Sequence, residues 1–211
     1  MRYSLVIFDL DGTLAHSLPW FRRNVNSVAH RFAFRRIDDE NIEPLRRAGS
    51  REILRRLNVP LWKLPAIARH MRQLKAAHMT DIPLFPGVDT MLRALTDSGI
   101  RLALVSSDHE SNARRQLGHS NAARFFHFEC GASFFGKAAK FRLVLKRAGV
   151  PAADAVAFGD ELRDIEAAHA AGIACAAVTW GYAAPEALRA HAQDFVFDRM
   201  EEVVCELTRA P

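Results

Sequence analysis

Residues 5–14 read LVIFDLDGTL, an apolar run that ends in two aspartates and a glycine. An unbroken run of branched and aromatic side chains of this length is typical of a strand buried within a parallel sheet. Asp9 and Asp11 stand two residues apart where this strand gives way to a turn, and Gly12 lets the backbone there approach a ligand closely. The sequence therefore predicts that the first strand ends in a chemically active loop.

Beyond Gly99 the chain alternates short apolar runs with amphipathic stretches. Strands that alternate with helices predict an α/β fold, with a parallel sheet covered by helices on both faces in a Rossmann-like three-layer arrangement. The expected strands are residues 101–107, 125–130, 155–160, 173–180 and 194–198, and the expected helices are residues 109–117, 138–148, 161–171 and 185–192. In such a sheet the carboxyl ends of the strands share one edge, where ligands bind.

Three of the predicted strands end in polar residues suited to a single phosphate site at that edge. They end at Asp9, at Ser106 and at Asp160, which follows Gly159. Mg²⁺ prefers oxygen ligands, and two of these carboxylates together with a loop carbonyl could supply them. Glu161 and Asp164 follow at the start of a helix, where the helix dipole tolerates their charge and where they could orient metal-bound water.

This set of motifs resembles that of the haloacid dehalogenase-like superfamily, specifically its phosphatase branch close to phosphoglycolate phosphatase. The resemblance covers essentially the whole chain, and four motifs in the right order are more specific than any one alone. The first motif, DxDGT, is met by Asp9, Asp11, Gly12 and Thr13, and the second, a Ser or Thr after an apolar strand, by Ser106. The third, a Lys ahead of a helix, falls on Lys137, and the fourth, GDxxxD, on Gly159, Asp160 and Asp164.

The resemblance implies a phosphate monoester hydrolase. Asp9 would attack phosphorus to form an aspartyl-phosphate, and Asp11 would protonate the leaving alcohol and then deprotonate the hydrolytic water. Because a halide leaving group needs no proton, the second aspartate favours phosphatase over dehalogenase chemistry. The groups expected to bind the substrate are Thr13, Ser106, Ser107, Lys137 and Arg51.

The cofactor implied is Mg²⁺, which would screen the repulsion between the nucleophile and the phosphate dianion. The residues expected around it are Asp9, Asp11, Asp160 and Asp164.

Two positions depart from the family pattern. Relatives commonly have Pro soon after the third-motif Lys, whereas this chain has a second candidate, Lys140; counting back from the helix favours Lys137, with Lys140 then an exposed helix residue. His16 stands where the family often has an acid, and it could sense phosphate or merely pack at a hinge.

Residues 18–84 are expected to form a helical cap domain inserted into a catalytic core of residues 1–17 and 85–211. Between Ala15 and Phe85 there are 14 Lys and Arg residues against 6 Asp and Glu, a net charge of +8, while the rest carries 15 against 18, a net charge of −3. A basic cap over an acidic site would attract an anionic phosphate ester. Arg51 is the expected contact with the far end of the substrate, and Arg46, Arg47 and Arg55 are alternatives.

Composition narrows the other classes of function. No stretch approaches the roughly 20 apolar residues that span a bilayer, the N-terminus lacks the uncharged core of a signal peptide, and three separated cysteines suggest free thiols, so we expect a cytoplasmic protein with no membrane partner. The basic residues are not interleaved with aromatic stacking positions in a recognisable nucleic-acid-binding module, so we expect no nucleic-acid partner. The alternatives on the same fold are a phosphomutase and a non-catalytic binding or regulatory protein, and either a monomer or a homodimer is expected.

Overall fold

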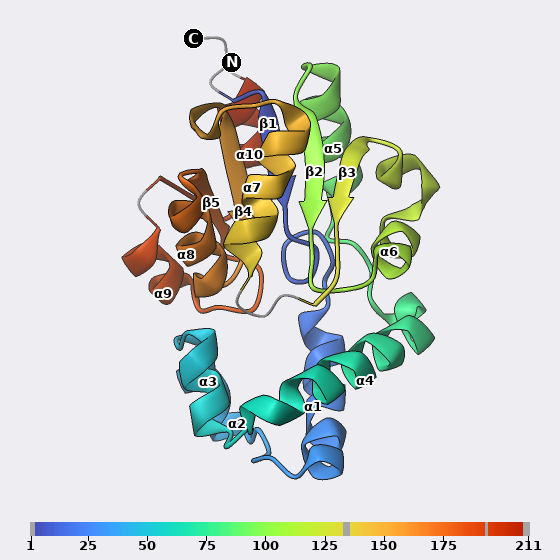
Figure 1. Cartoon of the computed structure of the whole chain (residues 1–211), viewed down its shortest axis with the longest axis vertical. Coiled ribbons are helices and arrows are strands. Elements are labelled where there is room, and N and C mark those ends of the chain that lie inside the picture. The colour runs from blue at the N-terminus through green and yellow to red at the C-terminus, as the bar shows by residue number, and fades with distance from the viewer. Residues whose placement is uncertain (1–2, 133–135, 193, 209–211) are drawn as a thin grey trace.

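The sheet of this chain consists of six parallel strands in the order β3-β2-β1-β4-β5-β6 (Figure 1). The structure is a computed structural model that describes residues 3–132, 136–192 and 194–208. The strands are β1 (Leu5–Phe8), β2 (Arg101–Val105), β3 (Phe125–Glu129), β4 (Ala155–Gly159), β5 (Ala174–Val178) and β6 (Phe195–Phe197). The strand order reverses on either side of β1, and ligands of open α/β sheets bind at such a reversal. The predicted α/β fold class is confirmed.

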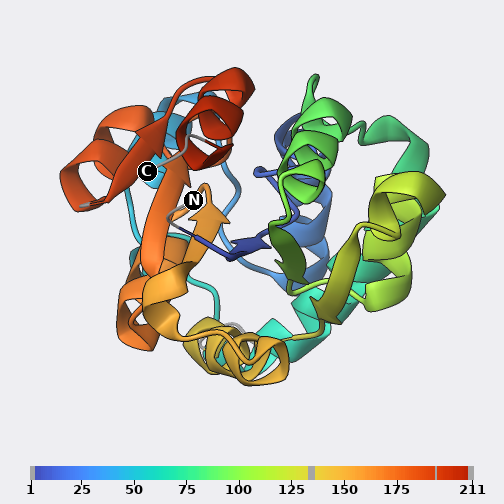
Figure 2. The same cartoon turned by 90° about the horizontal axis from the view of Figure 1, so that it is seen from above.

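Helices of the described part of the chain cover both faces of this sheet, which Figure 2 shows from above. One face carries α5 (Val88–Asp97), α6 (Glu110–Ala122) and α10 (Met200–Thr208), and the other carries α7 (Lys137–Ala148), α8 (Leu162–Ala171) and α9 (Pro185–His191). The helix predicted to end at Leu117 continues to Ala122 across a kink at Gly118, where φ is 74° and ψ is 163°. Glycine adopts this backbone conformation without strain, so the chain resumes helical geometry after it.

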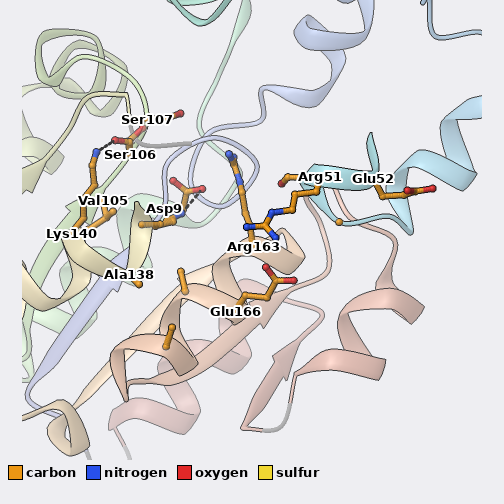
Figure 3. Close-up of a pocket in the computed structure, with 15 residues that line it drawn as sticks. Asp9, Arg51, Glu52, Val105, Ser106, Ser107, Ala138, Lys140, Arg163 and Glu166 are labelled. Atoms are coloured by element: carbon orange, nitrogen blue, oxygen red, sulfur yellow. Dashed lines mark hydrogen bonds and ion pairs between the residues drawn. The ribbon is translucent and has the colours of Figure 1, made fainter. Parts of the chain in front are cut away.

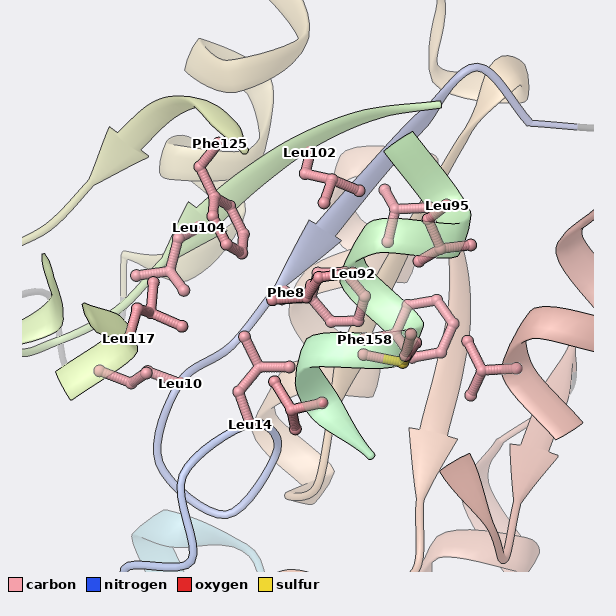
Figure 4. Packing of buried hydrophobic residues seen from close by; sticks show 14 of the residues in the cluster. Phe8, Leu10, Leu14, Leu92, Leu95, Leu102, Leu104, Leu117, Phe125 and Phe158 are labelled. Carbon is pink, nitrogen blue, oxygen red and sulfur yellow. The ribbon is translucent and has the colours of Figure 1, made fainter. Parts of the chain in front are cut away.

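Alternation along the strands divides the core into two clusters. In β1, Val6 and Phe8 join the cluster under α5, α6 and α10, while Leu5 and Ile7 join the cluster under α7, α8 and α9. Successive side chains of a strand point to opposite faces, so a strand that is apolar throughout must be buried on both. Figure 4 shows Phe8 beside Leu92 and Phe158 in the first cluster. The whole of β1 is buried, which holds the loop that follows it in a defined position.

The part of the β1–β2 connection that precedes α5 forms a separate group of helices, here called the helical segment (residues 18–84), which lies beyond the carboxyl ends of the strands (Figure 1). It consists of α1 (Leu18–Phe32), α2 (Asp39–Arg46), α3 (Ser50–Arg56) and α4 (Leu64–Ala77), with one-turn helices η1 (Leu61–Lys63) and η2 (Met79–Asp81); a further one, η3 (Ala152–Asp154), precedes β4. None of the described helices combines the length and apolar character that a bilayer crossing requires.

Two connecting segments of the chain link the helical segment to the sheet, and they form hydrogen bonds with each other. The amide of His16 donates to the carbonyl of Pro83 at 2.8 Å, and the amide of Phe85 donates to the carbonyl of Leu14 at 2.9 Å. The ring of His16 stacks on that of Phe85, with 4.7 Å between centroids. His16 therefore packs at the point where the chain crosses into the helical segment.

Candidate active site

Three buried carboxylates meet at the carboxyl edge of the sheet, where Asp9 follows β1 and Asp160 follows the neighbouring strand β4. Asp9, Asp160 and Asp164 each offer an oxygen atom, and these atoms lie within 4.8 Å of one another. Asp164 reaches the group from the first turn of α8, where its Oδ2 accepts hydrogen bonds from the amides of Asp160 and Glu161 at 3.1 and 3.0 Å. These residues are here called the carboxylate cluster.

Glycines surround the carboxylate cluster and make room for Asp160. A Cβ atom at Gly12 would lie 2.1 Å from Asp160 Oδ2, and one at Gly181 would lie 2.3 Å from the same atom. The Asp160 carboxylate is oriented by Thr13 Oγ1, which donates to Oδ1 at 2.8 Å, and by the amide of Tyr182, which donates to Oδ2 at 2.8 Å. Hard oxygen donors in a close-fitting, oriented group suit a divalent cation such as Mg²⁺.

The electrostatics of the carboxylate cluster also favour the binding of a divalent cation. Burial raises the pKa of Asp160 well above its usual range, and the nearby charges of Glu161, Asp164 and Asp9 raise it further. Burial also raises the pKa of Asp9, against the opposing effect of Lys137. Like charges held together in a buried site need compensating positive charge to remain ionised, and a divalent cation supplies it.

Lys137, the first residue of α7, faces the carboxylate cluster. Its ammonium lies 3.0 Å from Asp9 Oδ2 and 2.6 Å from Asp164 Oδ1. Lys140 does not share this position, because its ammonium donates to the main-chain carbonyls of Ser106 at 2.8 Å and Gly131 at 2.7 Å. The expectation that Lys140 is exposed is wrong: it is buried, since it bonds to carbonyl groups that follow β2 and β3.

Asp11 lies outside the carboxylate cluster, and its side chain is 30% exposed. Lys75, on α4 of the helical segment, donates to both oxygens of Asp11 at 2.7 and 2.8 Å and lies 3.1 Å from Oδ2 of the buried Asp108. Sequence reasoning did not single out Lys75. The sequence contains only a weak indication that this position is unusual: between Ala15 and Phe85 there are two lysines, of which Lys75 is one, and twelve arginines.

A cavity of about 460 Å³ opens beside Asp9 (Figure 3). Its polar lining comes both from the sheet side and from the helical segment: Asp9, Ser50, Arg51, Glu52, Ser106, Ser107, Lys137, Lys140, Arg163 and Glu166. Figure 3 shows Arg51 reaching from the helical segment toward Arg163 and Glu166. The cavity thus brings together four of the expected substrate-binding residues, whereas Thr13 is buried and directs its hydroxyl to Asp160.

The other arginines considered for the substrate have different positions. Arg46 donates to the carbonyl of Tyr182 at 2.9 Å, Arg55 pairs with Glu52, and Arg47 is exposed. Arg163 was not anticipated, because it occupies a variable position inside the GDxxxD motif; it pairs with Glu161, and its charge acts to lower the pKa of Asp9.

Known proteins resemble this chain over most of its length. The family model described as haloacid dehalogenase-like hydrolase matches residues 6–178. A phosphoglycolate phosphatase of Synechococcus elongatus is 29% identical over 205 residues, which cover 97% of each chain. A phosphoglycolate phosphatase of Xanthomonas campestris pv. campestris is 32% identical over 190 residues, which cover 84% of this chain and 83% of that one.

Solved structures show the same architecture. A predicted phosphatase from Clostridium acetobutylicum superposes with a TM-score of 0.81 at 21% identity and covers 98% of this chain and 99% of its own. CbbY from Rhodobacter sphaeroides, solved in complex with phosphate, has a TM-score of 0.71 at 26% identity, with 95% of this chain and 96% of its own covered. By the match of the family model and of the full-length relatives, the chain belongs to the haloacid dehalogenase-like hydrolases.

Proposed function

We propose that this protein is a Mg²⁺-dependent phosphatase that hydrolyses a small anionic phosphate monoester through an aspartyl-phosphate on Asp9. The observation that carries the proposal is the position of Asp9, which belongs to the carboxylate cluster, contacts Lys137 at 3.0 Å and borders the cavity. Relatives along the whole chain are phosphoglycolate phosphatases, which favours a phosphoglycolate-like ester or a sugar phosphate as the substrate.

In the first step of the proposed reaction, an oxygen of Asp9 forms a bond to phosphorus while the bond from phosphorus to the ester oxygen breaks. Asp11 gives its proton to that oxygen, and an alcohol leaves. Lys137 balances charge on Asp9 and on the phosphoryl group. Ser106 and Ser107 border the same cavity and are proposed to hold phosphoryl oxygens.

In the second step, water attacks the phosphorus of the aspartyl-phosphate, Asp11 takes up its proton, and phosphate and the Asp9 carboxylate are released. Mg²⁺, when bound by Asp9 and Asp160 with Asp164 nearby, supplies positive charge opposite the phosphate dianion. Since Lys75 holds both oxygens of Asp11, the ammonium must release at least one of them before Asp11 can carry a proton to the ester.

We further propose that residues 18–84 act as a cap domain on a core of residues 1–17 and 85–211. The support is that the helical segment lies over the strand ends and contributes Arg51 to the cavity (Figure 3). Arg51 is proposed to contact a second anionic group of the substrate. Replacing Arg51 by Ala should then raise the KM for phosphoglycolate but not for p-nitrophenyl phosphate, whereas Arg47→Ala, an exposed position on the same segment, should change neither.

The test of the proposed function is a panel of phosphate esters assayed with Mg²⁺ for the wild-type protein, Asp9→Asn and Asp97→Asn. Asp97 is exposed on α5 and serves as the matched control. We expect turnover by the wild type and the control and none by Asp9→Asn, together with a hydroxylamine-sensitive phosphoprotein in the wild type. Turnover that survives Asp9→Asn would overturn the mechanism, interconversion of sugar phosphate isomers would indicate a phosphomutase, and absence of turnover on every ester would favour a regulatory protein.

A further inference from the structure

The loop that connects β5 to α9 (residues 179–184) bonds to a residue of the carboxylate cluster. The amide of Tyr182 donates to Asp160 Oδ2 at 2.8 Å, and the amide of Ala183 donates to the main-chain carbonyl of Asp160 at 3.2 Å. Gly181 packs so closely on Asp160 that a Cβ atom there would lie 2.3 Å from its carboxylate. The position of the Asp160 side chain therefore depends on the backbone of this loop.

The other side of the same loop is held by the helical segment, through the last residue of α2. Arg46 Nε donates to the carbonyl of Tyr182 at 2.9 Å, and Arg46 Nη2 donates to the carbonyl of Ala183 at 3.4 Å. The main-chain carbonyl of Arg46 accepts a hydrogen bond from the amide of Ala184 at 2.9 Å. A single residue of the helical segment thus makes three hydrogen bonds to the backbone of the loop.

One peptide group connects the two sides. The carbonyl of the peptide between Tyr182 and Ala183 accepts from Arg46 Nε, and the N–H of the same peptide donates to the main-chain carbonyl of Asp160, next to the amide of Tyr182 that donates to the Asp160 carboxylate. A charged donor on the carbonyl polarises the amide and strengthens donation from its N–H, and the planar guanidinium restricts the orientation of the peptide. When α2 is docked, the peptide beside Asp160 is held from both ends; if α2 moved away, that peptide would lose its charged partner.

We propose that Arg46 is a positioning residue for the metal, which couples the docking of the helical segment to the cation affinity of the carboxylate cluster. The inference rests on the proposed function, in which this cluster binds a divalent cation. Because such coupling is reciprocal, cation binding also favours the docked position of α2. Arg46 then acts on the metal through the loop backbone and Asp160, without contacting substrate.

The test measures Mn²⁺ binding to the full chain by calorimetry and electron paramagnetic resonance, without substrate. Arg46→Ala is expected to bind Mn²⁺ about 3- to 10-fold more weakly than the wild type, less than the ~10- to 100-fold typical for losing a residue that bonds directly to a ligand. Arg46→Lys keeps the charge but offers no planar fork and should be intermediate. Arg47→Ala, exposed beside it, and Glu43→Gln, which removes only the ion pair of Arg46 at 3.0 Å, should bind as the wild type does.

A second measurement is hydrogen exchange of α2 with and without Mn²⁺. Metal should slow exchange there in the wild type but not in Arg46→Ala, a result that a general loss of stability would not produce. Equal Mn²⁺ affinity for the wild type, Arg46→Lys and Arg46→Ala would overturn the coupling while leaving the proposed function intact. A wild-type protein that binds no Mn²⁺ would overturn the proposed function itself, and the coupling with it.

Discussion

Replacing Lys75 by Met tests the ion pairs of Lys75 with Asp11 and Asp108, which connect the helical segment to the rest of the chain. The side chain of Lys75 is 6% exposed, and that of its partner Asp108 is 3% exposed. Met keeps the length and apolar volume of the side chain and removes only the ammonium. Asp108 Oδ1 would retain its hydrogen bonds from the amide of His109 at 2.7 Å and from Asn112 at 2.8 Å, whereas Oδ2 has no hydrogen-bonding group left among the described residues.

The expected loss in the free energy of unfolding is about 3 kcal/mol. Removing one partner of a buried ion pair costs about 3–5 kcal/mol, because the other charge stays buried without compensation. The lower end applies here, since Asp11 is 30% exposed and regains water when the ammonium is removed. The double variant Lys75→Met with Asp108→Asn removes the uncompensated charge as well and should recover at least about 1 kcal/mol of the loss.

The measurement is equilibrium unfolding in urea, followed by fluorescence in EDTA from about pH 6 to 9. Although burial acts to lower the pKa of Lys75, Asp11 and Asp108 raise it above its usual value. When the pKa of a lysine is higher in the folded state than in the unfolded state, its charge stabilises the folded protein fully below the unfolded-state pKa. This stabilisation is lost only as pH rises through the folded-state pKa. The difference in free energy of unfolding between the wild type and Lys75→Met should therefore be constant from about pH 6 to 9. Lys146→Met, on the exposed surface of α7, is the control. A loss below about 0.5 kcal/mol for Lys75→Met, within the range of ordinary surface substitutions, would refute the reasoning.

Three further predictions concern the metal site, the core and the surface. Gly181→Ala places a methyl group 2.3 Å from Asp160 Oδ2 and should weaken Mn²⁺ binding at least about 10-fold, measured by calorimetry. Leu92→Ala removes a fully buried side chain from the inner face of α5 and should lower the free energy of unfolding, measured by urea denaturation, by about 2–5 kcal/mol. The hydrogen bond from Arg189 lowers the pKa of Asp198, so Asp198→Asn should destabilise the protein at neutral pH, and the difference should vanish as pH falls from about 5 toward 2.

Each of these predictions has a control and a contrary result. Gly99→Ala, where an added Cβ would meet nothing within 4 Å, should leave Mn²⁺ affinity unchanged despite its strained φ; equal losses at both glycines would show that crowding of Asp160 is not the cause. Leu143, 36% exposed on α7, should tolerate Ala within about 0.5 kcal/mol, and a similar cost at both leucines would contradict the burial argument. A destabilisation by Asp198→Asn that persists at low pH would show that the carboxylate charge is not responsible.

The residues of the carboxylate cluster were predictable because their placement follows from local rules. A run such as Leu5–Phe8 forms a buried strand, parallel strands end at one edge, and Asp9 and Asp160 approach each other there because β1 pairs with β4. Asp164 follows from its place in the first turn of α8. Each of these inferences needs only the pattern within a few residues and the handedness of the fold.

The residues that sequence reasoning missed are those whose roles depend on contacts between distant segments. Lys75 has the pattern of a solvated helix residue, and nothing near it in sequence indicates that it meets Asp108. Arg46 was considered only as an alternative contact with the substrate, because nothing near it in sequence indicates that it bonds to Tyr182, in a loop without a motif. The misplacement of Lys140 has the same origin, since its burial depends on carbonyl groups that follow β2 and β3.

The central place of β1 in the sheet has a consequence for how the chain folds during synthesis. Leu5 pairs with Arg101 on one side and with Ala155 on the other, so β1 emerges from the ribosome long before either neighbouring strand exists. The helical segment, whose helices form from local contacts, is complete in the meantime, while β1 waits as an exposed apolar strand with two unpaired edges. At about 5–20 residues per second, this interval lasts several seconds, during which neither neighbouring strand is available to cover the apolar side chains of β1.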